Sequence, residues 1–201
     1  MKSFVNITSK CLPFSFANVD TDQIIPKQFL KLTQRTGFGK YLFYNWRFNK
    51  DGSINDKFIL NDSKYSNRKI LLTLDNFGSG SSREHAVWAL LDYGFKVIIA
   101  PSFADIFYNN CIKNGVLPIK LPKNEINYLF SNDELSVYVN LKKQELVISS
   151  FDIKTNRELS KKMTFDIEHS KKQILLDGLD EIDITLKLES KITEYEDTRH
   201  Q

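Results

Sequence analysis

The strongest constraint on the fold is a regular alternation of strand and helix patterns in the middle of the chain. Short apolar runs predict buried strands at residues 70–74, 96–100 and 116–119. The two intervening segments predict helices that begin near Ser82 and Ser102 and end at glycine caps, Gly94 and Gly115. Because strands that alternate with helices pair in parallel, this block predicts an α/β fold with a parallel sheet.

The flanking segments add strands of another kind. An alternating pattern predicts a half-buried strand over residues 3–7, and Pro26 suits the first turn of a short helix through Leu30. Two further strands are expected at 135–139 and 145–151, and residues 168–196 predict helices interrupted at Gly178. This mixture predicts a layered mixed sheet with helices rather than a clean Rossmann unit.

Composition narrows the class of protein. The 201 residues are 41% hydrophobic and 26% charged, as in an ordinary folded domain rather than a disordered chain. Neither a membrane span nor a secretory h-region is evident, so we expect a cytoplasmic protein that does not bind membranes. The two cysteines, Cys11 and Cys111, exclude a disulfide framework, zinc-ligand spacing and an iron–sulfur cluster held by this chain alone.

Charge is distributed unevenly along the chain. Residues 1–100 hold 14 Lys and Arg against 8 Asp and Glu, and the remainder holds 14 against 17. The first half is therefore +6 and the second −3. A basic half raises the alternative of a nucleic-acid-binding module. No recognised RNA motif or basic and aromatic strand pattern accompanies it, which disfavours that alternative.

The densest cluster of chemically useful residues is the segment from Gly78 to His85, which joins a strand end to a helix start. Its glycines permit close backbone approach, and a helix N-terminus offers unpaired amides to an anion. Arg83 adds a forked cation suited to a carboxylate. The segment therefore predicts an anion site, although Ser81 and Glu84 have the spacing of a simple capping box.

The spacing of this segment excludes several familiar motifs. Gly80 stands where a GxSxG motif needs its serine, GxxxxGK[ST] is missing, and Arg83 occupies the third glycine position of GxGxxG. His85 is a possible base, but a hydrogen-bonded structural role near the helix start is the favoured interpretation.

Two other segments leave alternatives open. Asp20-Thr21-Asp22 offers two carboxylates that suit a metal, an active-site hydroxyl or arginine, or an Asx-rich turn before a helix. Arg35 is either a second anion clamp or an ordinary surface residue. The aromatic residues that follow it form either a functional loop or a buried cluster, and they are Tyr41, Phe43, Tyr44, Trp46 and Phe48.

Four sequence blocks resemble one known family, in the family's order. The chain is similar to the small subunits of bacterial 3-isopropylmalate dehydratase over residues Asn18–Pro26, Arg35–Gly39, Gly80–Ala86 and Asp92–Phe107. The likeness continues through Asn110, Leu117-Pro118 and Asp177–Asp180, so it spans nearly the whole chain. Ser79 occupies a position that is often cysteine in close relatives.

The resemblance implies a fold and a division of labour between two chains. It implies a single swivelling β/β/α domain over residues 1–201, like the last domain of aconitase, with a C-terminal helical extension from about 168 to 201. A separate large subunit is expected to carry a [4Fe-4S] cluster, whose iron acts as a Lewis acid on the departing hydroxyl. This chain is expected to hold no metal and to be active only with that partner.

The resemblance also implies roles for individual residues. Ser81 is the expected base, and we expect substrate contacts from Gly80, Ser82, Arg83 and Arg35. A supporting set surrounds them: Asp20, Thr21, Asp22, Glu84 and His85.

The implied reaction interconverts 2-isopropylmalate and 3-isopropylmalate by dehydration and rehydration through 2-isopropylmaleate, in leucine biosynthesis. The substrate is thus a small dicarboxylate. The alternative is a related hydro-lyase acting on homoaconitate or a methyl-substituted malate, and the segment from Thr33 to Tyr44 is expected to discriminate. For an isopropyl substituent, Leu42 and Phe43 should face the substrate.

Overall fold

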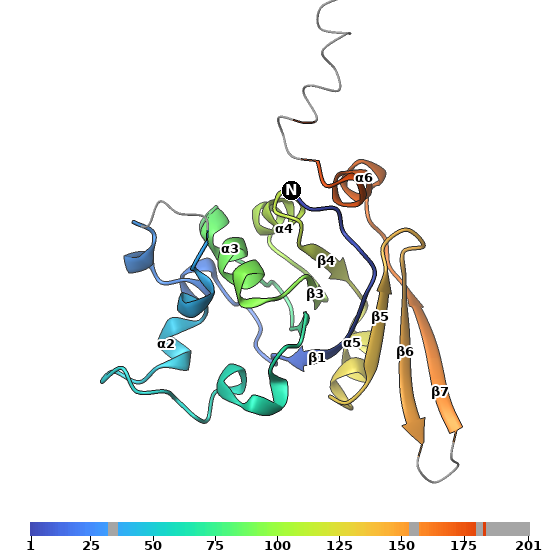
Figure 1. Ribbon diagram of the computed structural model, residues 1–201, viewed down its shortest axis with the longest axis horizontal. Helices are drawn as coiled ribbons and strands as arrows, with labels where there is room; N and C mark the ends of the chain where they lie inside the picture. Colours follow the sequence, from blue (N-terminus) through green and yellow to red (C-terminus); the bar gives the residue numbers. More distant parts are fainter. Residues whose placement is uncertain (32–35, 153–156, 180–182, 184–201) are drawn as a thin grey trace, which may run out of the picture.

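The computed structural model describes residues 1–31, 36–152, 157–179 and 183. Within these residues, seven strands form one sheet in the order β4-β3-β2-β1-β5-β6-β7 (Figure 1). The strands are β1 Ile7–Pro13, β2 Ile70–Leu72, β3 Val97–Ala100, β4 Leu117–Lys120, β5 Ser136–Asn140, β6 Glu145–Asp152 and β7 Arg157–Thr164. β1 to β4 pair in parallel, whereas β5, β6 and β7 pair antiparallel, so the predicted mixed sheet is confirmed.

Helices connect and cover this sheet. They are α1 Thr21–Ile24, α2 Tyr44–Arg47, α3 Glu84–Tyr93, α4 Asp105–Lys113, α5 Lys123–Phe130 and α6 His169–Asp177. Short 3-10 turns occur at η1 Lys27–Phe29, η2 Gly39–Tyr41, η3 Ile59–Asn61 and η4 Ser63–Tyr65. α3 links β2 to β3 and α4 links β3 to β4, which is the predicted alternation. No helix in the described ranges has the length and apolar character needed to cross a bilayer.

The parallel strands are buried on both faces. Leu71 and Ile98 point into one core cluster with α3, while Ile70, Val97 and Ile99 point into a second cluster with α5 and the antiparallel strands. Successive strand residues face opposite sides of a sheet, so a strand buried on both faces consists of an unbroken apolar run. This explains why the central strands were predictable.

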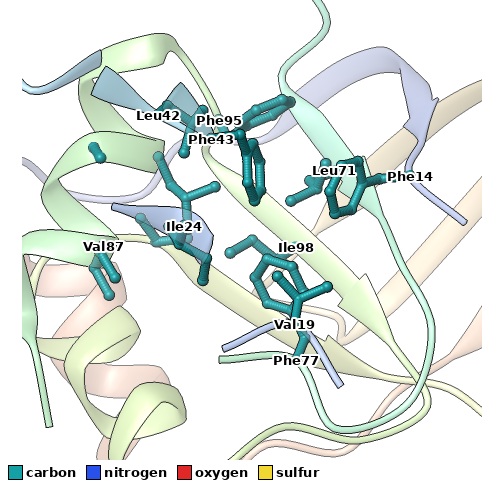
Figure 2. Packing of buried hydrophobic residues seen from close by; sticks show 14 of the residues in the cluster. Phe14, Val19, Ile24, Leu42, Phe43, Leu71, Phe77, Val87, Phe95 and Ile98 are labelled. Carbon is teal, nitrogen blue, oxygen red and sulfur yellow. The ribbon is translucent and has the colours of Figure 1, made fainter. Parts of the chain in front are cut away.

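The aromatic segment after Arg35 belongs to the first core cluster. Leu42 and Phe43 are fully buried, and the Phe43 ring stacks on Phe14 with ring centroids 4.6 Å apart (Figure 2). Trp46 packs against the same rings. The buried-cluster interpretation is therefore right. The expectation that Leu42 and Phe43 face the substrate is wrong, because both side chains are fully buried in the core.

The N-terminal strand lies later in the chain than predicted. It begins at Ile7, and the residues before it pack against α6: the Phe4 amide donates to the Leu175 carbonyl at 2.8 Å. The predicted helix after Pro26 is only the turn η1. Strand β7 was not predicted from the sequence. Its lysines are exposed and interrupt any apolar run, and Met163 is the one buried residue among those of the strand whose burial is described.

The C-terminal part agrees with the sequence as far as it is described. α6 ends at Gly178, which adopts the left-handed conformation of a helix cap (φ 70°, ψ 29°). A Cβ at this position would lie 2.6 Å from the backbone nitrogen of Ser3, so glycine is also required by the close approach of the N-terminus. Beyond Leu179, the expected helical extension lies outside the described residues except for Asp183.

Candidate active site

The site is built on the turn that follows β2. Gly78 has a φ of 79°, and a Cβ there would lie 2.1 Å from the Phe107 ring, so only glycine fits. The amides of Gly78 and Ser79 both donate to the Val19 carbonyl, at 2.7 and 3.1 Å. This turn therefore runs directly beside the Asp20-Thr21-Asp22 segment.

Thr21 holds the backbone of the Ser81 region. Its amide donates to the Ser79 carbonyl at 2.9 Å, and its Oγ1 donates to the Ser81 carbonyl at 3.2 Å. The Arg83 amide donates to the same Ser81 carbonyl at 2.8 Å. Ser81 itself is exposed at the entrance to α3. Its backbone is thus anchored, and its hydroxyl is open to a ligand.

Asp22 orients Arg83. The carboxylate accepts from both terminal nitrogens of the guanidinium, Nη1 to Oδ1 and Nη2 to Oδ2, the second at 3.2 Å. The Arg83 side chain is only 13% exposed. Hydrogen bonding from Arg83 lowers the pKa of Asp22, and the charge of Lys27 acts in the same direction. Of the roles considered for this carboxylate, the structure favours orientation of an arginine, Arg83.

Asp20 caps the start of α1. Its Oδ1 accepts from the Gln23 amide at 2.7 Å, while the Gln23 side chain accepts from the Asp20 amide at 2.8 Å. This pair is a complete capping box at the start of α1. Both carboxylates of the segment are therefore engaged by protein donors. Over the described ranges, no group of three or more His, Cys, Asp and Glu is placed to hold a metal ion.

The alternative interpretation of Ser81 and Glu84 as a capping box is wrong. α3 begins at Glu84, about two residues later than expected, and its N-cap is Arg83, which makes no capping hydrogen bond through its side chain. Ser81 lies two positions before the N-cap, outside the position from which a serine caps a helix. Glu84 instead accepts from Asn114 Nδ2 at 2.7 Å. The first turn of α3 is thus left without a side-chain cap.

His85 packs against two aromatic rings. Its ring lies 5.4 Å from the Phe38 ring and 4.6 Å from the Trp88 ring, measured between centroids. Burial lowers the pKa of His85, which favours the neutral imidazole. The expected structural role is supported, although aromatic packing takes the place of the expected hydrogen bond.

The structure gives no position for Arg35, which lies outside the described residues. The glycines that follow it are anchored on α3, since the amides of Gly37 and Gly39 both donate to Asp92 Oδ2, at 3.0 and 2.8 Å. A Cβ at Gly39 would lie 2.8 Å from the Tyr93 amide nitrogen, which explains the glycine.

Lys27 lies beside this cluster and was not singled out from the sequence. Its Nζ lies 3.6 Å from Asp22 Oδ2, and its side chain is 74% exposed. Asp22 therefore stands between two cations, Arg83 and Lys27. The only sequence signal was that Lys27 follows Asp22 by five positions. The chain has many lysines, and this spacing does not distinguish Lys27 from the others.

The chain is similar to known proteins over nearly its whole length. Residues 1–124 match the aconitase C-terminal domain family. A 3-isopropylmalate dehydratase small subunit of Buchnera aphidicola subsp. Pemphigus spyrothecae is 54% identical over 193 residues, covering 94% of this chain and 92% of the relative. The small subunit of Brevibacillus brevis is 51% identical over 201 residues, covering 99% and 100%.

A solved structure shares the fold. The crystal structure of 3-isopropylmalate dehydratase from Methanocaldococcus jannaschii aligns with a TM-score of 0.64 at 29% identity, covering 95% of this chain and 99% of that one. The α/β fold class expected from the sequence is confirmed. On its sequence, its fold and its site motif, the chain belongs to the family of 3-isopropylmalate dehydratase small subunits, within the aconitase C-terminal domain family.

Proposed function

We propose that this chain is the small subunit of a hydro-lyase that interconverts 2-isopropylmalate and 3-isopropylmalate through 2-isopropylmaleate in leucine biosynthesis. Two relatives named as 3-isopropylmalate dehydratase small subunits match almost the whole length of the chain at 51% and 54% identity. The observation that carries the proposal is the meeting of an exposed Ser81, the uncapped start of α3 and an Arg83 held by Asp22.

Arg83 binds one substrate carboxylate. A guanidinium has five N–H donors, and Asp22 accepts from only two of its nitrogens, so further donors remain for a ligand. Asp22 also fixes the plane of the fork, so the geometry for a bidentate carboxylate is preorganised. The backbone at Gly80, the Ser82 hydroxyl and the first amides of α3 complete the anion site.

Ser81 removes the proton from the substrate carbon. A serine alkoxide is a strong base that must be stabilised, and the positive end of the α3 dipole together with Arg83 supplies that stabilisation. The two hydrogen bonds to the Ser81 carbonyl keep the residue in place while its hydroxyl stays exposed. Ser81 thus acts as base, and Thr21 acts on it as a positioning residue.

Lys27 is the proposed partner of the second carboxylate. Isopropylmalate is a dicarboxylate, and binding it without an unpaired charge needs a cation for each end. Arg83 and Lys27 flank the same aspartate, and Lys27 is largely exposed. Arg35, proposed from the sequence as a further substrate contact, remains a proposal.

The residues of this chain do not fit a [4Fe-4S] cluster. Burial raises the pKa of the Cys11 thiol to about 12, and the pKa of Cys111 is also raised well above its usual value by burial. Iron–sulfur clusters are bound by thiolates. We therefore propose that the cluster expected for the enzyme is carried by the large subunit, and that the complex works in the cytoplasm.

The test is anaerobic co-expression with the large subunit of the same genome, followed by assay on isopropylmalate, citramalate, citrate and homoaconitate side by side. Isopropylmalate should be turned over fastest, and the isolated chain should be inactive. Equal or faster turnover of homoaconitate would replace the proposed substrate with the tricarboxylate alternative. Turnover by the isolated chain would overturn the division between two subunits.

A further inference from the structure

A second hollow lies away from the proposed active site. The N-terminal segment, the later part of α3 and the turn after α4 enclose a cavity of about 360 Å³. Phe4, Ile7 and Leu91 form an apolar wall, and Val5, which is 71% exposed, stands at its edge. Leu91 follows Glu84 by seven residues, about 10 Å along the helix axis, so the apolar wall lies about two helical turns from the start of α3. Asn114, which also lines the cavity, connects the two places through its hydrogen bond to Glu84.

Three lysines line the same cavity. They are Lys2, Lys69 and Lys96, and among the described residues no carboxylate lines the cavity with them. Within the described part of the chain, none of the three makes an ion pair. Desolvation lowers the pKa of Lys96, and the like charges of Lys2 and Lys69 lower it further. The lysines therefore repel one another, and a bound anion would relieve that repulsion.

We propose that this cavity binds a small aliphatic monocarboxylate. The apolar wall suits a branched or straight alkyl chain, because its contact with Phe4, Ile7 and Leu91 removes apolar surface from water. The lysines suit the carboxylate end, because all three line the same cavity and none makes an ion pair within the described residues. An inorganic anion would leave the wall unused, and a neutral alkyl compound would leave the lysines unpaired.

The chain contains a natural reporter for this site. The Trp88 indole Nε1 donates to Asn114 Oδ1 at 2.8 Å, and Asn114 lines the cavity. The protein has two tryptophans, and the other, Trp46, stacks on Phe16 and Phe43. In a nitrogen-15 correlation spectrum, the Trp88 indole resonance should respond to cavity binding, while the Trp46 resonance serves as internal reference.

The experiment titrates sodium 4-methylpentanoate into the full-length chain and follows both indole resonances. A saturable shift of Trp88 with Trp46 unchanged is expected. Lys96→Met should weaken binding about tenfold or more, the effect of losing one charge-assisted contact. Lys57→Met, an exposed lysine elsewhere, should bind as the unmodified chain does. Lys69→Met tests the same point if Lys96→Met does not fold.

Three results would overturn the proposal. One is the lack of a saturable Trp88 shift at millimolar ligand. Another is equal binding of 4-methylpentanamide, which has the alkyl chain without the charge. The third is an equal response to inorganic phosphate, which would mean that the lysines attract any anion and that the apolar wall contributes nothing.

Discussion

The two helices that meet at the site, α1 and α3, begin in opposite ways. α1 has four residues and a complete capping box between Asp20 and Gln23. α3 has ten residues and no side-chain cap. The short helix needs its cap, because it buries only Thr21 and Ile24. The longer helix is held by its buried face, so it tolerates an open first turn.

This difference separates stability from function at one place in the molecule. A side-chain cap satisfies amides that would otherwise be unpaired, and an uncapped helix start leaves those amides to a ligand. Asp20 therefore stabilises the scaffold, whereas Ser81, Ser82 and Arg83 remain available for substrate. Substitutions at these positions should therefore affect turnover and stability separately.

Ser81→Ala should reduce turnover of the reconstituted complex by about 10² to 10⁴, the usual range for a lost general base. Its melting temperature should stay close to that of the unmodified chain, because Ser81 makes no cap. Steady-state kinetics and thermal unfolding of the same preparation measure both quantities. Near-normal turnover would refute the assignment of Ser81 as base.

Asp22→Asn should lower kcat/KM by roughly 10- to 100-fold, since a charge-assisted contact to Arg83 becomes a neutral one. The aspartate acts through the arginine, so Asp22→Glu should recover part of the loss if the longer carboxylate still reaches Arg83. Asp51→Asn, in an exposed turn, is the matched control. Unchanged kinetics in Asp22→Asn would show that Arg83 needs no orientation.

Lys27→Met should raise KM for isopropylmalate by about tenfold with little change in kcat, as expected for loss of one contact to a carboxylate in the bound substrate. Lys31→Met, four residues further along and also exposed, provides the control. If both variants change KM equally, Lys27 acts through its positive charge alone and makes no direct contact with the substrate carboxylate.

Asp20→Ala should cost about 1 kcal/mol in unfolding free energy, the usual value of an N-cap. Its effect on turnover should be far smaller than that of Ser81→Ala. Denaturant unfolding measures the first quantity and kinetics the second. The reverse outcome, with turnover abolished and stability intact, would place Asp20 in the catalytic machinery and remove the contrast between the two helices.

The pairing of Asp22 predicts a small dependence of stability on pH. The folded state lowers the pKa of this carboxyl, so its contribution is fully present above the usual aspartate pKa of about 4 and is lost as the pH falls through the lower folded value. The melting-temperature difference between the unmodified chain and Asp22→Asn should therefore shrink on acidification from pH 6. A difference that grows instead would contradict the ion pair.

Local patterns predicted the central part of the fold well, for identifiable reasons. The strands β2, β3 and β4 are short apolar runs between glycine-capped helices, and burial on both faces makes such runs conspicuous. Predictions failed where burial is one-sided or partial. In the described part of β7, residues 159–162 are all exposed and only Met163 is buried. The N-terminal segment has a strand-like pattern but packs against α6.

Residue patterns along the chain were enough to predict the alternation of the parallel block and its helix-ending glycines and, through the Gly80–Ala86 motif, the family. The three-dimensional packing was needed to show which helix start is capped and which is open. It also decided the partner of Arg83, because Asp22 lies 61 residues away along the chain and meets it only where the turn after β2 pairs with the Asp20 segment. Contacts across such separations depend on how strands and helices pack, and residue spacing carries no record of that packing.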